Sequence, residues 1–447
     1  MRKCINFGEY NKYYKYIILS CIFNYLTDYV DSGTLSKDLN SLKIINNDNQ
    51  SLFEHSVIFD CFNFIGIFII SFILYKFKGQ NIDSSFEISH KNDKEEEKNK
   101  FLSYLNLSLL LSFWIIIDHI TNIIYSLMIF DYWMFELLFV SLIYSKLYKI
   151  KIYNHQKLGI IINSISSIIF RIINFCILAN QRDDNYEDFN IKYKWFIPIS
   201  IIIYLSIIIS TSYIFTKLKF YTDLKFISPI KLLIIYGILG FVISSISCVI
   251  ETSFKCIGKL KEYFCRIVEY SENEENYDIY IDNLFIFFKE FSFLDSKDIT
   301  FEIIIILFMM IFNFFSKYFD ILVIIYLTPM HFLFSSLVYV FFKDLIELIR
   351  YIIEKKGKIA DNDLYNYKEA LLNILLYFFS FIGFMIFLEI IELNFCKLNY
   401  DLRKYIIERG ISDINQSEIN ESIINNEENS LLNNNVELPI NETKKLY

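Results

Sequence analysis

The apolar stretch IKLLIIYGILGFVISSISCVIET, at 230–252, decides the fold class of this chain. A helix needs about 20 such residues to cross the roughly 30 Å of hydrocarbon in a bilayer, and this stretch is long enough. Nine other stretches share its character, and charged or polar segments separate them. The ten expected spans are 13–31, 56–75, 102–128, 131–148, 158–180, 195–217, 230–252, 301–317, 320–342 and 370–393. The sequence therefore predicts an all-α, multi-pass membrane protein.

The composition agrees with this fold class and argues against others. Of the 447 residues, 54% are hydrophobic and 18% are aromatic, which is more apolar surface than one or two soluble cores bury. The first span runs through Asn24 and Asp28 without a small-residue cleavage site, so we expect it to be retained rather than removed as a signal peptide. The net charge of -8 comes mainly from one acidic loop and the tail, which argues against a nucleic-acid partner. The eight cysteines lack CxxC or CxxH spacing, so neither a metal site nor a cofactor is expected.

The distribution of lysine and arginine predicts the orientation, because positively charged loops stay in the cytosol. Basic residues collect in three segments: the N-terminus (Arg2, Lys3, Lys12, Lys15), the fourth-to-fifth connection (Lys146, Lys149, Lys151, Lys157) and the sixth-to-seventh connection (Lys217, Lys219, Lys225, Lys231). This pattern places both termini, including 1–12, in the cytosol, and we expect a plasma membrane or an endomembrane of a eukaryote. The segments 32–55, 181–194 and the acidic 253–300 then face the other side. Cys256 and Cys265, within the last of these, are compatible both with a disulfide and with two free thiols.

Three further segments need a separate interpretation. The basic segment 343–369 is expected on the non-cytosolic side against the charge rule, so either it forms an amphipathic helix on the membrane surface or one span is miscounted. The loop 76–101, whose part 91–100 is dense in both signs of charge, is expected to be a solvated flexible linker. The segment 411–447 is rich in Asn, Glu and Ser, so we expect a disordered cytosolic tail.

Charged groups inside the apolar spans are the main functional signal, since no enzyme motif is present. The chain has no Gly-rich phosphate loop ending in Lys, no HExxH and no GxSxG, so we do not expect an enzyme. A charge inside a span costs a few kcal/mol and usually marks a pathway or a paired site. Polar residues share one helical face in the third span (Trp114, Asp118, Asn122, Tyr125, with His119 beside them), in the fifth (Asn163, Ser167, Arg171, Asn174) and in the fourth (Tyr132, Glu136).

The depth of three of these residues predicts a common site. At about 1.5 Å per residue, Asp118 and Arg171 lie about 20 to 24 Å from the cytosolic ends of their helices, and Glu136 comes from the opposite side to the same level. One guanidinium can bridge both acids there. This triad is either a structural ion network or a site where a carboxylate binds a proton or the substrate and Arg171 attracts an anionic group. Asp131 and Asp320 stand near expected helix ends, so we interpret them as interfacial.

The ninth expected span carries a second group of polar residues. Thr328, His331 and Ser335 share a face, and Pro329 beside them is expected to free a backbone carbonyl and kink the helix, which suits a cavity lining or a gate. The alternative for His331 is a structural histidine with its hydrogen bonds satisfied. Asn313 is expected to face the same region from the eighth span. Two acids near the cytosolic end of the tenth span, Glu389 and Glu392, are expected to be hydrated.

The sequence resembles the drug/metabolite transporter superfamily, which includes EamA-like carriers and nucleotide-sugar transporters. The resemblance rests on FDYWMFE at 130–136, on HQKLG at 155–159 opening the fifth span, and on YLTPMH at 326–331 opening the ninth. It implies two inverted five-helix repeats, here 13–180 and 195–393, with a substrate cavity between them and alternating access without ATP. The few glycines within the spans and the long acidic loop 253–300 depart from nucleotide-sugar transporters, so their substrate class is not carried over.

Two function classes follow from these observations, with a third less supported. We expect a secondary carrier or exchanger of a small polar or anionic metabolite, with the lipid bilayer and a small-molecule solute as partners and a homodimer possible. Its candidate residues are Asp118, His119, Asn122, Glu136, Arg171, Asn174, Asn313, Thr328 and His331. The alternative is a non-transporting receptor or scaffold that binds a partner through 253–300. A lipid-modifying enzyme with Asp118 and His119 as a base pair is less supported, because neither a metal nor a nucleophile accompanies them.

Overall fold

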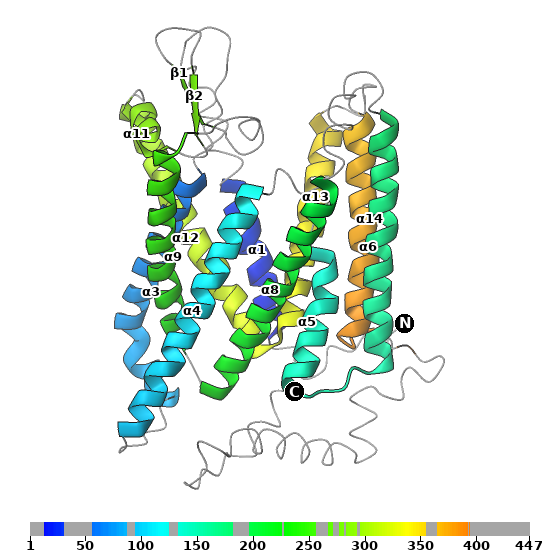
Figure 1. The fold of residues 1–447 in the computed structure, drawn as a ribbon, viewed down its shortest axis with the longest axis horizontal. Helices are drawn as coiled ribbons and strands as arrows, with labels where there is room; N and C mark the ends of the chain where they lie inside the picture. The colour runs from blue at the N-terminus through cyan, green and yellow to red at the C-terminus, as the bar shows by residue number, and fades with distance from the viewer. Residues whose placement is uncertain are drawn as a thin grey trace. The chain divides into compact units, whose positions relative to one another are not determined.

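A computed structural model describes the chain at 13–30, 56–86, 94–124, 133–181, 196–225, 228–255, 267–270, 277–280, 283–292, 296–354, 364–391 and 393. These parts are helical except for one short β-hairpin (Figure 1). The helices are α1 (Tyr14–Val30), α3 (Ser56–Phe86), α4 (Lys94–Ile124), α5 (Trp133–Tyr148), α6 (Asn154–Gln181), α8 (Phe196–Lys225), α9 (Pro229–Ser253), α11 (Leu284–Ser292), α12 (Ser296–Tyr326), α13 (Pro329–Glu354) and α14 (Leu364–Phe387). The two antiparallel strands are β1 (Ile267–Tyr270) and β2 (Tyr277–Tyr280), with Ile267 opposite Tyr280.

Four helical segments are long and apolar enough to cross a membrane. They are Val57–Phe77, Ile202–Thr222, Pro229–Ser253 and Ile299–Tyr326, and two shorter apolar segments are Leu105–Thr121 and Leu371–Phe387. Large apolar side chains such as Ile246 and Val249 of α9 are 56% and 63% exposed, which a water-soluble surface tolerates poorly in such numbers. This confirms the membrane class of the protein.

Each of the ten expected spans coincides with a helix in the described part, but the boundary between the eighth and ninth is wrong. The sequence predicts a break between 317 and 320, whereas α12 continues to Tyr326 and α13 begins at Pro329. Proline fits at the first helical position because its missing N–H has no partner there anyway. Pro329 therefore starts a helix, and the predicted kink within the ninth span is wrong.

Two loops predicted from charge are partly helical. α3 extends to Phe86 and α4 begins at Lys94, so most of 91–100 belongs to the first turns of α4 and the flexible-linker interpretation is wrong there. α13 continues to Glu354 and includes Lys343 and Arg350, so this part of 343–369 is an extension of the ninth helix. Mixed charges do not end a helix, because Glu and Lys are good helix formers. The segment 411–447, Asn49, Cys256 and Cys265 lie outside the described residues.

The chain divides into two compact units. Unit 1 comprises 1–17, 130–216 and 326–447, and unit 2 comprises 18–129 and 217–325. Each unit thus takes helices from both of the predicted repeats, 13–180 and 195–393. This division concerns compactness rather than symmetry, so the inverted repeat stays a prediction.

In unit 2 the helices α3 and α9 pack along one another (Figure 1). Two glycines of α9 make this close approach possible: a Cβ added at Gly237 would lie 2.7 Å from the backbone nitrogen of Phe68, and one at Gly240 would meet the ring of Phe64. α4 and α11 also contact α9. At one end of the unit, Phe287 of α11 joins an apolar cluster with Val57, Ile58, Phe59, Cys248, Ile305 and Met309.

In unit 1 the helices α6 and α14 form the corresponding close pair (Figure 1). Their contact is reciprocal, because a Cβ at Gly159 would lie 2.6 Å from the carbonyl oxygen of Gly383, and a Cβ at Gly383 would lie 2.8 Å from that of Gly159. α13 packs against both α14 and α5, and α5 packs against α6. The rings of Phe215 and Phe332 join α8 to α13 at 4.9 Å between centroids.

Candidate functional site

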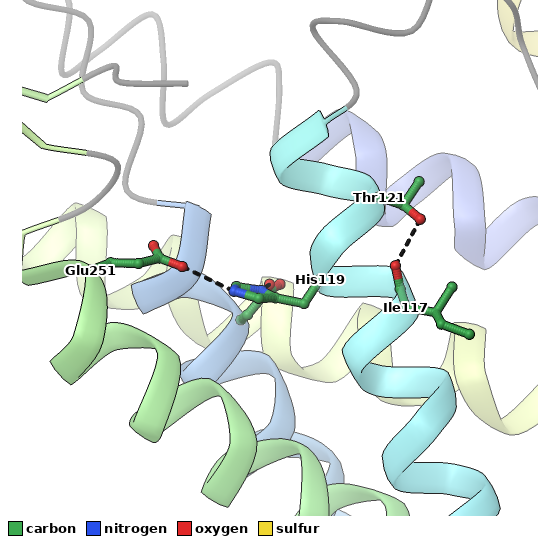
Figure 2. A network of polar contacts seen from close by, with 5 residues as sticks. Ile117, His119, Thr121 and Glu251 are labelled. Atoms are coloured by element: carbon green, nitrogen blue, oxygen red, sulfur yellow. Dashed lines mark hydrogen bonds and ion pairs between the residues drawn. The ribbon is translucent and has the colours of Figure 1, made fainter. Parts of the chain in front are cut away.

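His119 lies between two carboxylates in unit 2, and Figure 2 shows its contact with one of them, Glu251. Its Nε2 is 3.0 Å from Oε1 of Glu251, and its Nδ1 is 3.8 Å from Oδ2 of Asp60. The first distance is that of a hydrogen bond and the second is that of a longer ionic contact. We call these three residues, Asp60, His119 and Glu251, the outer cluster.

Three helices bring the outer cluster together. Asp60 lies near the beginning of α3, His119 near the end of α4 and Glu251 in the last turn of α9. α3 and α9 approach closely at Gly237 and Gly240, and α4 packs on α9, so side chains at these ends of the three helices meet. Figure 2 shows the imidazole reaching from α4 toward Glu251. The predicted orientation puts this end on the non-cytosolic side.

The outer cluster is partly shielded from solvent. The exposed fractions of the side chains are 13% for His119, 7% for Glu251 and 30% for Asp60. Asp60 is therefore the member that water reaches most easily. The part of the chain that the structure describes contains no group of three or more His, Cys, Asp or Glu residues suited to hold a metal ion. An imidazole between two carboxylates can instead accept, hold and release a proton.

Unit 2 contains further charged residues that interact with Asp60 of the outer cluster. Lys317 of α12 interacts electrostatically with Asp60, Asp118 and Asp320, and its Nζ lies 5.7 Å from the ring centroid of Trp114. The Trp114 ring in turn lies 5.3 Å from that of Tyr236, between centroids. A lysine within an apolar helix is costly unless acids and aromatic faces compensate it. Acids from three helices, α3, α4 and α12, thus act electrostatically on Lys317.

Asp320 anchors a second polar group in unit 2, and its interfacial interpretation is wrong. It is 4% exposed, inside α12, because that helix continues past the predicted break. Its Oδ1 accepts hydrogen bonds from Ser20 Oγ at 2.6 Å and from Asn24 Nδ2 at 3.3 Å, and Ser316 Oγ donates to Asn24 Oδ1. Two polar residues of α1 therefore satisfy a carboxylate of α12.

The predicted triad is distributed over both units. Asp118 belongs to unit 2, whereas Glu136 and Arg171 belong to unit 1, and the side chain of Arg171 is outside the described part. Glu136 is 1% exposed and accepts a hydrogen bond from Thr211 Oγ1 at 2.8 Å. Its Oε2 has no hydrogen-bond partner among the described residues, which leaves a place for a donor. The triad stays a prediction.

The predicted group at the ninth span forms around the beginning of α13. Thr328 Oγ1 lies 2.8 Å from Nδ1 of His331, whose ring is 6.2 Å from that of Tyr14. Ser335 Oγ donates to the carbonyl of Ile17 at 3.4 Å, so the shared face packs against the start of α1. His331 is 6% exposed. These contacts favour the structural alternative for His331 over a cavity lining.

Asn163 lines a small cavity in unit 1, together with Ser336, Ser380, Tyr377 and apolar residues of α13 and α14. The cavity measures about 10 Å³, which suffices for the centre of one water molecule but not for a metabolite. The amide of Asn163 and the hydroxyl of Ser380 have no hydrogen-bond partner among the described residues, and the cavity offers room for one water molecule beside them.

Near this cavity, His155 Nε2 lies 3.0 Å from Oε1 of Glu389. The His155 side chain is 2% exposed and that of Glu389 is 27% exposed. The predicted hydration of Glu389 therefore accounts for only one side of the carboxylate, because the other side pairs with a buried histidine.

Among the remaining predicted residues, Asn313 lies in α12 of unit 2, away from Thr328 in sequence and in a different unit. Asn122 and Asn174 lie in α4 and α6, and their side chains are outside the described part. Sequence reasoning missed Asp60, Glu251 and Lys317. Each is a charged residue within an apolar helix, the same signal that led to Asp118, but each stands near an end of its expected span, where a charge is ordinary.

Neither a search against protein-family models nor a search of curated proteins found a match to this chain.

Proposed function

We propose that the protein is a secondary transporter that carries a small polar or anionic solute across its membrane by alternating access. One observation carries this proposal. In the expected order of ten spans, helices five places apart pack in pairs: the second with the seventh (α3 and α9), the fourth with the ninth (α5 and α13) and the fifth with the tenth (α6 and α14).

Such pairing is what an inverted repeat produces. A pseudo-two-fold axis in the membrane plane exchanges helix n with helix n + 5, and the helices nearest the axis then contact their own counterparts. The reciprocal approach of Gly159 and Gly383 has this property locally, because each glycine faces the carbonyl oxygen of the other. Carriers built on this plan bind substrate near the bilayer midplane and move one body against another.

The charges inside the helices support transport over a receptor or scaffold. A scaffold gains nothing from an ionised group in hydrocarbon, which costs a few kcal/mol unless it is compensated. Here unit 2 contains Asp60, His119, Glu251, Lys317 and Asp320 within or at the ends of apolar helices. In unit 1, Glu136 has one oxygen free of described partners. We assign the predicted Arg171 to an anionic group of the solute.

Transport is tested with the full-length protein in lipid vesicles. We expect saturable uptake of at least one compound from a panel of small carboxylates, amino acids, phosphorylated sugars and nucleotides. Preloading the vesicles with the same compound should accelerate uptake severalfold, because exchange by alternating access does not require the empty carrier to return. Vesicles without protein are the control. Correctly folded protein that shows neither uptake nor acceleration across the panel would favour the receptor or scaffold.

The triad provides a residue-level test of the same proposal. The combined variant Asp118→Asn, Glu136→Gln, Arg171→Leu removes all three charges together, which often preserves folding. We expect it to elute as a folded protein and to lose transport by at least tenfold. Full transport by the folded variant would show that the triad is only structural.

A further inference from the structure

The outer cluster differs from an ordinary buried ion pair in its ratio of charges. One imidazole faces two carboxylates, Asp60 at 3.8 Å and Glu251 at 3.0 Å. The three groups carry a charge of -2 when the imidazole is neutral and -1 when it has taken up one proton. A change of one charge in a region of low dielectric is large enough to shift the balance between two conformations.

Other charged groups around His119 also come from the packed helices, and they increase the electrostatic effect of a proton on the imidazole. On its own helix, Asp118 precedes it and interacts electrostatically with Asp60. From α12, Lys317 interacts with both acids, and from α9 the hydroxyl of Tyr236 interacts with Lys317. Counting Asp60, Asp118 and Glu251 against Lys317 leaves an excess of negative charge, which a proton on His119 reduces. The surroundings thus favour a cation at this position.

The members of the outer cluster differ in their exposure to solvent among the described residues. Asp60 is 30% exposed, His119 is 13% exposed and Glu251 is 7% exposed, so exposure decreases from α3 toward α9. Beside the cluster, Phe59 and Cys248 belong to the apolar core that α11 covers with Phe287. Water therefore reaches His119 past Asp60, at the end of the unit that the predicted topology places on the non-cytosolic side.

We propose that the outer cluster is a proton site, loaded from the non-cytosolic side through Asp60, and that this proton is the coupling ion of the transporter. The step is the addition of one proton to the imidazole of His119, with its hydrogen bond to Glu251 and its contact with Asp60 holding the charged form. This inference rests on the proposed transport function, and it names the ion that drives it.

The first test measures the proton directly and does not depend on transport. NMR of the histidine side chains in the full-length protein in lipid nanodiscs reports on five imidazoles. The signal of His119 is assigned as the one that is missing from the spectrum of the His119→Gln variant. Asp60→Asn and Glu251→Gln should each move the pH midpoint of this signal by about one unit, because each removes a neighbouring charge. His155→Gln removes a comparable histidine from unit 1 and should leave the pH midpoint of the His119 signal unchanged. A signal that does not respond to pH, or that ignores both acid replacements, would overturn the proton site.

The second test measures coupling. With a solute identified in vesicles, a pH gradient of two units should raise its accumulation tenfold or more in one direction of the gradient, and one proton permits at most about 100-fold. His119→Gln should lose this response, and His155→Gln should keep it. If solute accumulation by the wild-type protein does not change with the pH gradient, proton coupling is refuted, although the transport function is not. If the panel yields no transported solute, the transport function fails, and the NMR result alone decides whether the outer cluster binds a proton.

Discussion

Replacing Gly159 with alanine should separate α6 from α14, because no space exists for the added methyl group. Its Cβ would lie 2.6 Å from the carbonyl oxygen of Gly383 and 2.9 Å from the backbone nitrogen and the Cβ of Phe387. These atoms belong to the backbone of α14 or lie next to it, so no side-chain rotation relieves the clash. The helices must move apart by about 0.8 Å to restore an ordinary contact.

This movement has a second consequence one helical turn away. The 3.0 Å hydrogen bond between His155 and Glu389 joins α6 to the turn directly after α14, and a separation of about 0.8 Å takes it beyond hydrogen-bond range. Overpacking costs about 1 to 3 kcal/mol, and a lost hydrogen bond to a charged group adds about 1.5 to 3 kcal/mol. We therefore expect Gly159→Ala to lose about 2.5 to 6 kcal/mol of stability.

The assay is thermal unfolding of purified full-length protein in detergent, where such a loss lowers the midpoint by roughly 5 to 15 °C. Gly383→Ala should behave alike, since its Cβ would lie 2.8 Å from the carbonyl oxygen of Gly159. Ile165→Ala is the control, because this side chain of the same helix is 51% exposed and its truncation creates no clash with α14. If both α6–α14 variants unfolded within 1 °C of the wild type, the close backbone contact would not exist and the reasoning would fail.

Three other predictions concern the buried polar groups and the topology. Thr211→Val should lower the stability by about 1 to 3 kcal/mol in the same unfolding assay, because Glu136 loses its hydrogen-bond donor at 2.8 Å. Adding Glu136→Gln to this variant should recover most of the lost stability. Equal stability of Thr211→Val and the wild type would contradict the contact. Asp320→Ala should reduce the yield of folded protein, because Lys317 loses a compensating acid. The double variant Asp320→Ala, Lys317→Met should restore part of that yield. If it does not, the electrostatic interaction between the two residues is contradicted. Asn49 should be glycosylated in eukaryotic cells, which a glycosidase-sensitive shift in gel mobility would detect. A C-terminal epitope should be accessible to a protease added on the cytosolic side, and its protection would show that the predicted orientation is wrong.

The sequence alone sufficed for the membrane class. The length of an apolar stretch is a local property, and each of the ten expected spans overlaps a helix in the described part of the chain. Four of these helices are long and apolar enough to cross a membrane, and the count of ten spans stays a prediction. The misplaced boundary between the eighth and ninth expected spans, near 318–329, has an identifiable cause. Asp320 suggested a helix end, but its partners Ser20 and Asn24 come from α1, and such distant partners let a carboxylate lie inside a continuous helix.

Which charges meet was decided only by the tertiary structure. Asp118 and His119 were recognisable as charges within a span, yet nothing in the sequence indicated that His119 would contact Asp60 and Glu251 rather than a group on a neighbouring span. The pairing depends on α3 approaching α9 at Gly237 and Gly240, a contact between segments about 170 residues apart in sequence. Spacing along one helix tells which residues share a face, but the partner of that face depends on how distant helices pack.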